Sequence, residues 1–195
     1  IAQEILNCGI TLFNHFHESD TEVGEIALEL NKLADSIALG ALLKDKIKES
    51  IPIVERYVKD KPIRQKINKV KDELQYISNL IEQFKEQDDT LLNVRRFLDD
   101  CSNKLSVIMY NLGHEEQIYI NISSGVVLNA QGMLIRSINK AQSGIRYKED
   151  LVNFRHLLNE AIIITNSLGL LHMEEVLRDQ YQENKNTLIQ IEQNI

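Results

Sequence analysis

Imidazole and carboxylate side chains, which bind metal ions and transfer protons, are most concentrated between His15 and Glu22. Two imidazoles close to carboxylates are a ligand set that zinc accepts when a loop brings them together. On a helix, however, His15 and His17 would point to different sides, and acidic residues are common in the first turn of a following helix. We therefore predict an ordinary helix boundary here, with no metal site and no cofactor.

The other three histidines lack the spacing that metal or proton-transfer chemistry needs. None has the Glu-x-x-His spacing with which di-iron bundle proteins place two ligands on one helical face. His114 precedes two glutamates, as in a zinc protease helix, but no second histidine comes four residues later. His156 with Glu160, and His172 with Glu175, have the spacing of ordinary surface pairs on a helix.

Motifs for nucleotide binding and covalent catalysis are also missing from the sequence. It contains no glycine-rich phosphate loop, no nucleophile elbow and no Cys-x-x-Cys pair, so we predict no catalytic residue. Cys8 and Cys101 both fall on apolar helical stripes, which predicts buried thiols in a reducing compartment, the cytoplasm. The longest apolar runs are far shorter than the roughly 20 residues that span a bilayer, so we expect no membrane crossing.

Charge is distributed unevenly along the 195 residues, whose net charge is −7. Residues 1–43 carry one lysine and seven acidic residues, for a net charge of −6, whereas residues 44–71 carry ten basic and four acidic residues, for +6. Such a basic band attracts an acidic protein surface, a nucleic-acid backbone or lipid head groups, unless it is only a solvated helix face. The candidate partner-binding residues are Lys44, Lys46, Lys48, Arg56, Lys59, Arg64, Lys66 and Lys69.

Residues 115–142 are the longest weakly charged segment, and they predict the helix around which the fold is organised. Apolar residues recur at helical spacing from Ile118 to Ile138, and small residues occupy the remaining sides. Gly125 and Gly132 would each destabilise a helix by about 1 kcal/mol relative to alanine. We therefore expect these glycines to mark close approach by neighbouring helices.

Two heptad patterns precede this central helix. Apolar residues are spaced 4-3-4-3-4-3 from Ile63 to Phe84 and 3-4-3-4-3-4 from Leu91 to Leu112. The polar stretch between them is short, so residues 62–112 predict a coiled-coil-like antiparallel hairpin. Each of its helices would be about 33 Å long, at 1.5 Å per residue.

The two ends of the chain are also predicted to be helical. Residues 1–16 predict a first helix, and Ser19 with Glu22 a capping box that opens a second helix running to about Leu43. Pro52 is expected in the first turn of a new helix. Two more helices are expected within residues 151–195, with a break at Gly169. The residues expected to face the core on the second helix are Val23, Ile26, Ala27, Leu30, Leu33, Ala34, Ile37 and Ala41.

Together these patterns predict an all-α fold, an antiparallel bundle of about six to eight helices with the weakly charged helix at its centre. We expect one domain over residues 1–195, and we expect it to be a segment of a longer protein. The favoured function is a non-catalytic module for protein–protein interaction or assembly, such as a cytoplasmic scaffold, whose partner is another protein. The sequence does not predict its oligomeric state.

Two other functions stay open from the sequence. The first is an enzyme or ligand-binding bundle with a site between helices, formed by the polar residues Asn121, Asn129, Gln131 and Arg136 of the central helix. The second is a regulatory domain that binds an anionic partner, such as nucleic acid or a membrane surface, through residues 44–71.

Overall fold

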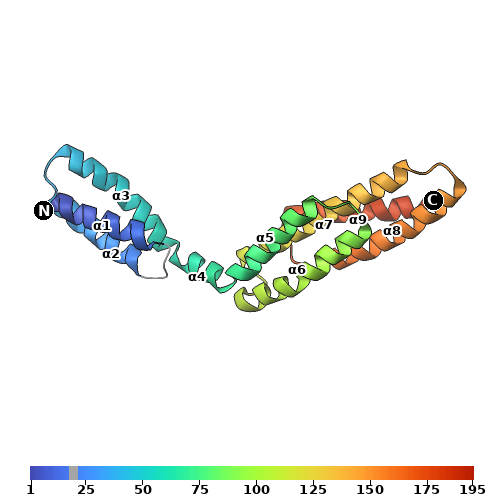
Figure 1. Ribbon diagram of the computed structural model, residues 1–195, viewed down its shortest axis with the longest axis horizontal. Helices are drawn as coiled ribbons and strands as arrows, with labels where there is room; N and C mark the ends of the chain where they lie inside the picture. The colour runs from blue at the N-terminus through green and yellow to red at the C-terminus, as the bar shows by residue number, and fades with distance from the viewer. Residues whose placement is uncertain (18–21) are drawn as a thin grey trace. The chain divides into compact units, whose positions relative to one another are not determined.

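The computed structural model describes residues 1–17 and 22–195 (Figure 1). Within them the chain forms nine α-helices and no strand, which confirms the predicted all-α bundle with more helix breaks than expected. The chain divides into two compact units, Ile1–Lys66 and Ile67–Ile195. The expectation of a single 1–195 domain stays a prediction, and the two units are described separately.

Unit 1 consists of three helices that pack against one another, followed by the start of a fourth. These are α1 (Ala2–Phe16), α2 (Val23–Ile37), α3 (Ala41–Lys59) and α4 (Lys61–Lys69). Each of the first three contacts the other two, and Figure 1 shows them side by side. The predicted capping box of Ser19 and Glu22 involves a residue outside the described part of the chain.

The helices of unit 1 approach each other closely at two glycines, Gly9 and Gly24. A Cβ atom on Gly9 would lie 2.7 Å from Oδ1 of Asn31, and one on Gly24 would lie 2.6 Å from the Tyr57 ring. Small side chains are therefore required where α2 meets α1 and α3. The buried hydrophobic cluster of this unit is correspondingly small and consists of Leu6, Ala34, Ala38 and Ile47.

Two predicted boundaries in unit 1 are wrong. The second helix ends at Ile37 rather than near Leu43, because the backbone is already extended at Ala38, with φ −71° and ψ 127°. Gly40, with φ 101°, then precedes α3. Pro52 lies inside α3 rather than in the first turn of a new helix. A proline there removes one helical hydrogen bond, which the flanking turns of this 19-residue helix tolerate.

Unit 2 contains the predicted hairpin in a shortened form. Its helices are α5 (Lys71–Lys85) and α6 (Leu91–Leu112), which pack together with the Phe84 and Phe97 ring centroids 5.0 Å apart. Thr90 caps α6 by accepting a hydrogen bond from the Asn93 backbone N–H.

The first heptad helix is interrupted, contrary to prediction. Val70 separates α4 from α5, with φ −131° and ψ 20°. Its side chain is fully buried, whereas the earlier seam residues Ile63 and Ile67 are exposed. The heptad spacing continues in phase across this break, which is why the pattern indicated one helix.

The predicted central helix is α7 (Gln117–Ser143), which packs against α5, α6, α8 (Lys148–Leu168) and α9 (Glu175–Gln193). It ends beside Gly144, and Gly113 with φ 95° closes the preceding helix. Its buried positions include Tyr119, Val126, Val127, Ala130, Leu134 and Ile138.

The expected role of the glycines in α7 is wrong. A Cβ atom on Gly125 would meet no atom within 4 Å, and one on Gly132 would meet only the end of the Arg136 side chain. The glycine at which helices of unit 2 approach closely is Gly169, which caps α8 beside the hydroxyl of Tyr181. That hydroxyl donates a hydrogen bond of 3.0 Å to the Thr165 carbonyl.

Among the residues that the structure describes, α7 is also the one helix that by length and composition meets the requirements for crossing a membrane. Half of its most apolar window is buried against the other helices of unit 2. Core helices of water-soluble bundles combine length, low charge and burial in the same way.

Candidate protein-interaction site

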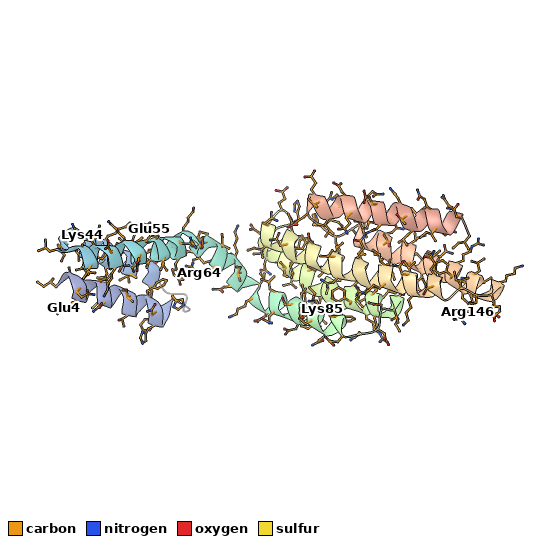
Figure 2. The ribbon with its side chains drawn as sticks, turned by 90° about the horizontal axis from the view of Figure 1, so that it is seen from above. Glu4, Lys44, Glu55, Arg64, Lys85 and Arg146 are labelled. Atoms are coloured by element: carbon orange, nitrogen blue, oxygen red, sulfur yellow. The ribbon has the colours of Figure 1, made fainter. Side chains whose placement is uncertain are left out.

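Five of the eight predicted partner-binding residues lie on α3, and all five are exposed: Lys44, Lys46, Lys48, Arg56 and Lys59. The exposed side of the same helix also carries Asp45, Glu49 and Glu55, so basic and acidic groups alternate along it. Figure 2 shows Lys44 near the start of α3 and Glu55 farther along it. The surface of α3 is therefore mixed in charge, which weakens its attraction for anions.

The remaining three predicted residues lie on α4, where they have different surroundings. The guanidinium of Arg64 stacks on the Tyr57 ring, and its Nη1 donates a hydrogen bond to the Tyr57 carbonyl. Lys66 is half-buried and Lys69 is exposed. Arg64 is thus engaged inside unit 1, and Lys69 belongs to unit 2.

Tyr57 gathers an aromatic cluster around the Arg64 contact. Its ring meets Phe13 edge-on, with centroids 5.0 Å apart, and Phe13 stacks on His17 at 5.4 Å. The Tyr57 hydroxyl donates a hydrogen bond to the His17 carbonyl. The cluster joins the ends of α1, α3 and α4, so we assign it a structural role.

The largest departure from the expected packing is on α2, where aliphatic side chains form an exposed row. Ile26, Leu33 and Ile37 are 50%, 50% and 43% exposed, and Leu30 between them is half-buried. Their 4-3-4 spacing places all four on one side of the helix. The expectation that Ile26, Leu33 and Ile37 face the core is wrong, whereas Val23, Ala27 and Ala34 are buried as predicted. The core side of α2 carries smaller residues, which also include Gly24 and Asn31.

The direction of this row follows from the contacts of α2 with α3. Gly24 abuts Tyr57, and Asn31 Nδ2 donates a 2.9 Å hydrogen bond to Ser50 Oγ. Leu33 comes nine residues after Gly24, about two and a half turns, and so lies on the opposite side of α2. The exposed row therefore faces away from α3.

A second row on α1 faces the same way. Asn14 lines a groove against α3, and Ile5 comes nine residues earlier, about two and a half turns, on the opposite side of α1. Leu12 lies close to the Ile5 side. Both are half-buried, and Ile5 also packs partly against the buried cluster of unit 1. Because α1 and α2 pack side by side, the two rows form one surface, which we call the α1/α2 face. It consists of Ile5, Leu12, Ile26, Leu30, Leu33 and Ile37.

The border of the α1/α2 face is acidic. Glu22, Glu25 and Glu29 run beside the aliphatic row of α2 at 3-4 spacing, and Glu4 lies on α1. The sequences of α1 and α2 contain one lysine, Lys32, and no arginine. That lysine lies 3.5 Å from Glu55 of α3, on the far side from the face.

Two positive groups outside these helices reach the acidic border. The amine of Ile1 lies 3.3 Å from Glu4, and Lys61 reaches the border from α4. Nζ of Lys61 lies 2.8 Å from Glu25 and 3.9 Å from Glu22, and the hydrogen bond to Glu25 raises the pKa of Lys61. Among the described residues, no ion-pair partner lies within reach of Glu29. Negative charge therefore persists beside the middle of the face.

A groove of about 310 Å³ lies on the opposite side of α1, against α3. Ile10 and Phe13 line one wall and Ile53 the other, with Ser50 in the lining. Asn31, which bonds to Ser50, is fully buried, and its Oδ1 has no hydrogen-bond partner. This arrangement fixes the register of α2 against α3.

The polar residues of α7 that suggested a ligand site do not gather around one cavity. Asn129 donates to the Gly125 carbonyl of its own helix, and Arg136 makes a bidentate pair with Asp89 at 2.7 and 2.9 Å. Asn121 is exposed, whereas Gln131 is buried with Nε2 unpartnered. A hollow of about 480 Å³ between α7 and α9 is lined by Asn121 and none of the other three.

Two histidines far apart in the sequence meet at one end of unit 2. The rings of His114 and His172 lie 5.6 Å apart, and Tyr119 Oη lies 3.4 Å from Nδ1 of His172. Burial raises the pKa of Tyr119. In residues 1–17 and 22–195, no group of three or more histidine, cysteine or acidic side chains is placed to hold a metal ion.

The two cysteines have different environments, contrary to the prediction that both are buried. Cys101 is buried in α6, and burial raises its pKa to about 12. Cys8 is exposed on α1. The apolar residues around Cys8 in sequence belong to the α1/α2 face as well as to the core, so the stripe that contains them does not imply burial.

Comparisons with protein-family models, with curated proteins and with solved structures found no match for this chain.

Proposed function

We propose that this protein is a non-catalytic interaction module that binds a protein partner through the α1/α2 face. The observation that carries the proposal is the aligned row of Ile26, Leu30, Leu33 and Ile37 on α2, of which all but the half-buried Leu30 are exposed. Isolated exposed aliphatic residues are normal on protein surfaces, but contiguous apolar patches bordered by polar residues mark interaction sites.

The arrangement of α2 supports this proposal further. A helix on the surface of a bundle normally turns its large apolar residues toward the core. In α2 the side facing the core has small residues, such as Gly24, Ala27 and Ala34, and the outward side has the larger leucines and isoleucines. Fully burying one such aliphatic side chain contributes about 1.5–3 kcal/mol. Covering the face would recover stabilisation that folding of unit 1 leaves unused.

Affinity capture with matched variants tests the proposal. Tagged wild-type protein, the double variant Ile26→Gln with Leu33→Gln, and a control double variant would be incubated with native lysate at moderate salt. The control, Val152→Gln with Ile163→Gln, changes two exposed aliphatic residues of α8 in the same way. We expect a stoichiometric protein to be recovered with the wild type and the control only. Equal recovery by the Ile26/Leu33 variant, with unchanged helical content by circular dichroism, would refute the α1/α2 face as the binding surface.

A further inference from the structure

Building on the proposed function, we infer that the partner presents an amphipathic helix whose aliphatic stripe is bordered by lysine or arginine. This helix would lie along the α1/α2 face, on the side opposite α3.

The shape of the face favours a helix as its occupant. Two neighbouring helices present two rows of aliphatic side chains, Ile5 and Leu12 on α1 and Ile26 to Ile37 on α2. Side chains at 3-4 spacing on a third helix can pack between two such rows, as in four-helix bundles. The row on α2 extends over about 16 Å, at 1.5 Å per residue. A partner helix of three to four turns would therefore cover it.

The charge of the border favours basic residues on that helix. Glu22, Glu25 and Glu29 lie beside one row and Glu4 lies on the other helix, while Lys32 is held near Glu55 on the far side. Lys61 offsets the charge near Glu22 and Glu25, and the amine of Ile1 offsets it near Glu4, which leaves Glu29 without an ion-pair partner among the described residues. Complementary charges at the border of an interface select the partner and increase its rate of association. The same acidic border disfavours an anionic membrane surface.

A second copy of this chain is a poorer occupant. In a two-fold symmetric dimer, the same face of each copy meets its equivalent. Pairing two α1/α2 faces would bring the acidic border of one copy, which includes Glu29, toward the acidic border of the other. Like charges would then surround the apolar contact. Such juxtaposition opposes association. The partner inferred here is therefore a different surface of opposite charge.

Two designed peptides test the inference directly. Each would be a helix of about 18 residues, or five turns, with the same leucine stripe, bordered by lysine in one peptide and by glutamate in the other. Fluorescence anisotropy would measure the binding of each labelled peptide to the full chain. We expect the lysine-bordered peptide to bind at least about tenfold more tightly, with the difference shrinking as salt is raised.

Variants of the chain locate the binding. Ile26→Gln with Leu33→Gln should weaken binding of the lysine-bordered peptide about tenfold or more. Val152→Gln with Ile163→Gln should leave it unchanged. Glu4→Lys with Glu29→Lys should reverse the preference between the two peptides. Glu4 and Glu29 are exposed, so this charge variant should fold normally. Its change in peptide preference therefore tests the inference even if the Ile26/Leu33 variant fails to fold.

Three outcomes would overturn the inference. They are equal binding of the two peptides, binding of the lysine-bordered peptide that survives the Ile26/Leu33 change, and a dimer in sedimentation experiments that the same change dissociates. If the peptides fail to bind but affinity capture still depends on Ile26 and Leu33, the proposed function stands and this inference falls. If capture is also independent of these residues, both fall.

Discussion

The guanidinium carbon of Arg64 lies 3.4 Å from the centroid of the Tyr57 ring, a stacking contact that attaches the start of α4 to the end of α3. The same side chain donates a hydrogen bond to the Tyr57 carbonyl. Arg64 is one of the residues that sequence analysis assigned to an anionic partner. Its contacts show how a basic residue in a charged stretch can be used inside the fold.

Replacing Arg64 with alanine should therefore lower the stability of unit 1. A cation–π contact contributes about 0.5–2 kcal/mol, and the hydrogen bond is lost with it. Urea denaturation followed by circular dichroism would measure the change, with Lys69→Ala as an exposed control. An unfolding curve for Arg64→Ala that coincides with the wild type would show that the stacking is energetically irrelevant.

Reversing the charges of Lys59, Lys66 and Lys69 to glutamate separates the basic segment from the α1/α2 face. If the α1/α2 face is the binding surface, partner capture should persist in this triple variant, with helical content unchanged. An anionic partner bound through residues 44–71 would instead be lost, and nucleic acid bound there would also dissociate steeply with salt. Loss of capture in this variant alone would favour the regulatory alternative.

Alanine substitutions at Gly9 and Gly125 should have opposite effects on stability. A Cβ on Gly9 would lie 2.7 Å from Asn31 Oδ1 and 3.3 Å from the Ala27 carbonyl, so overpacking should destabilise unit 1 by about 1–3 kcal/mol. At Gly125 no atom lies within 4 Å of the added carbon, and alanine should stabilise α7 by up to about 1 kcal/mol. Chemical denaturation would measure both. A stabilising Gly9→Ala would mean that α1 and α2 pack more loosely than described.

The two thiols should differ sharply in reactivity. Cys8 is exposed and should react with a thiol reagent near pH 8, whereas Cys101, with its pKa raised to about 12, should react only after unfolding. Reaction of two thiols in the native protein would contradict the burial of Cys101. The raised pKa means that the folded state favours the protonated Cys101 thiol. The protonated thiol therefore contributes fully to the stability of the folded protein below pH 9.0, the ordinary pKa of a cysteine. This contribution is lost as the pH rises toward 12.

Periodicity was sufficient to predict the helices around the core of unit 2. In α6 and α7 the large apolar residues face inward, so the side that the sequence marks as hydrophobic is also the buried side. The spacing from Leu91 to Leu112 matched a continuous helix for the same reason. The helix break at Val70 was not predicted, because the apolar residues on either side of it keep the same heptad spacing that a continuous helix would have.

Hydrophobic periodicity also could not predict the α1/α2 face, because it does not distinguish exposed from buried apolar residues. Ile26, Leu33 and Ile37 adjoin Ala27 and Ala34 on the helix, and together they read as one broad stripe. Only the close approach at Gly9 and Gly24 shows that the small residues pack inward and leave the larger ones outside. The repeated small residues of α2 were the available signal, because they permit tighter helix packing than leucine does.

The small core of unit 1 has a consequence for the protein in the cell. Its buried hydrophobic cluster has two alanines among its four residues. A unit of this size therefore has a small free energy of unfolding. A partner that binds only the folded form would raise the melting temperature of unit 1 and slow its proteolysis. The amount of this protein would then follow the supply of its partner, with unpartnered copies the first to be degraded.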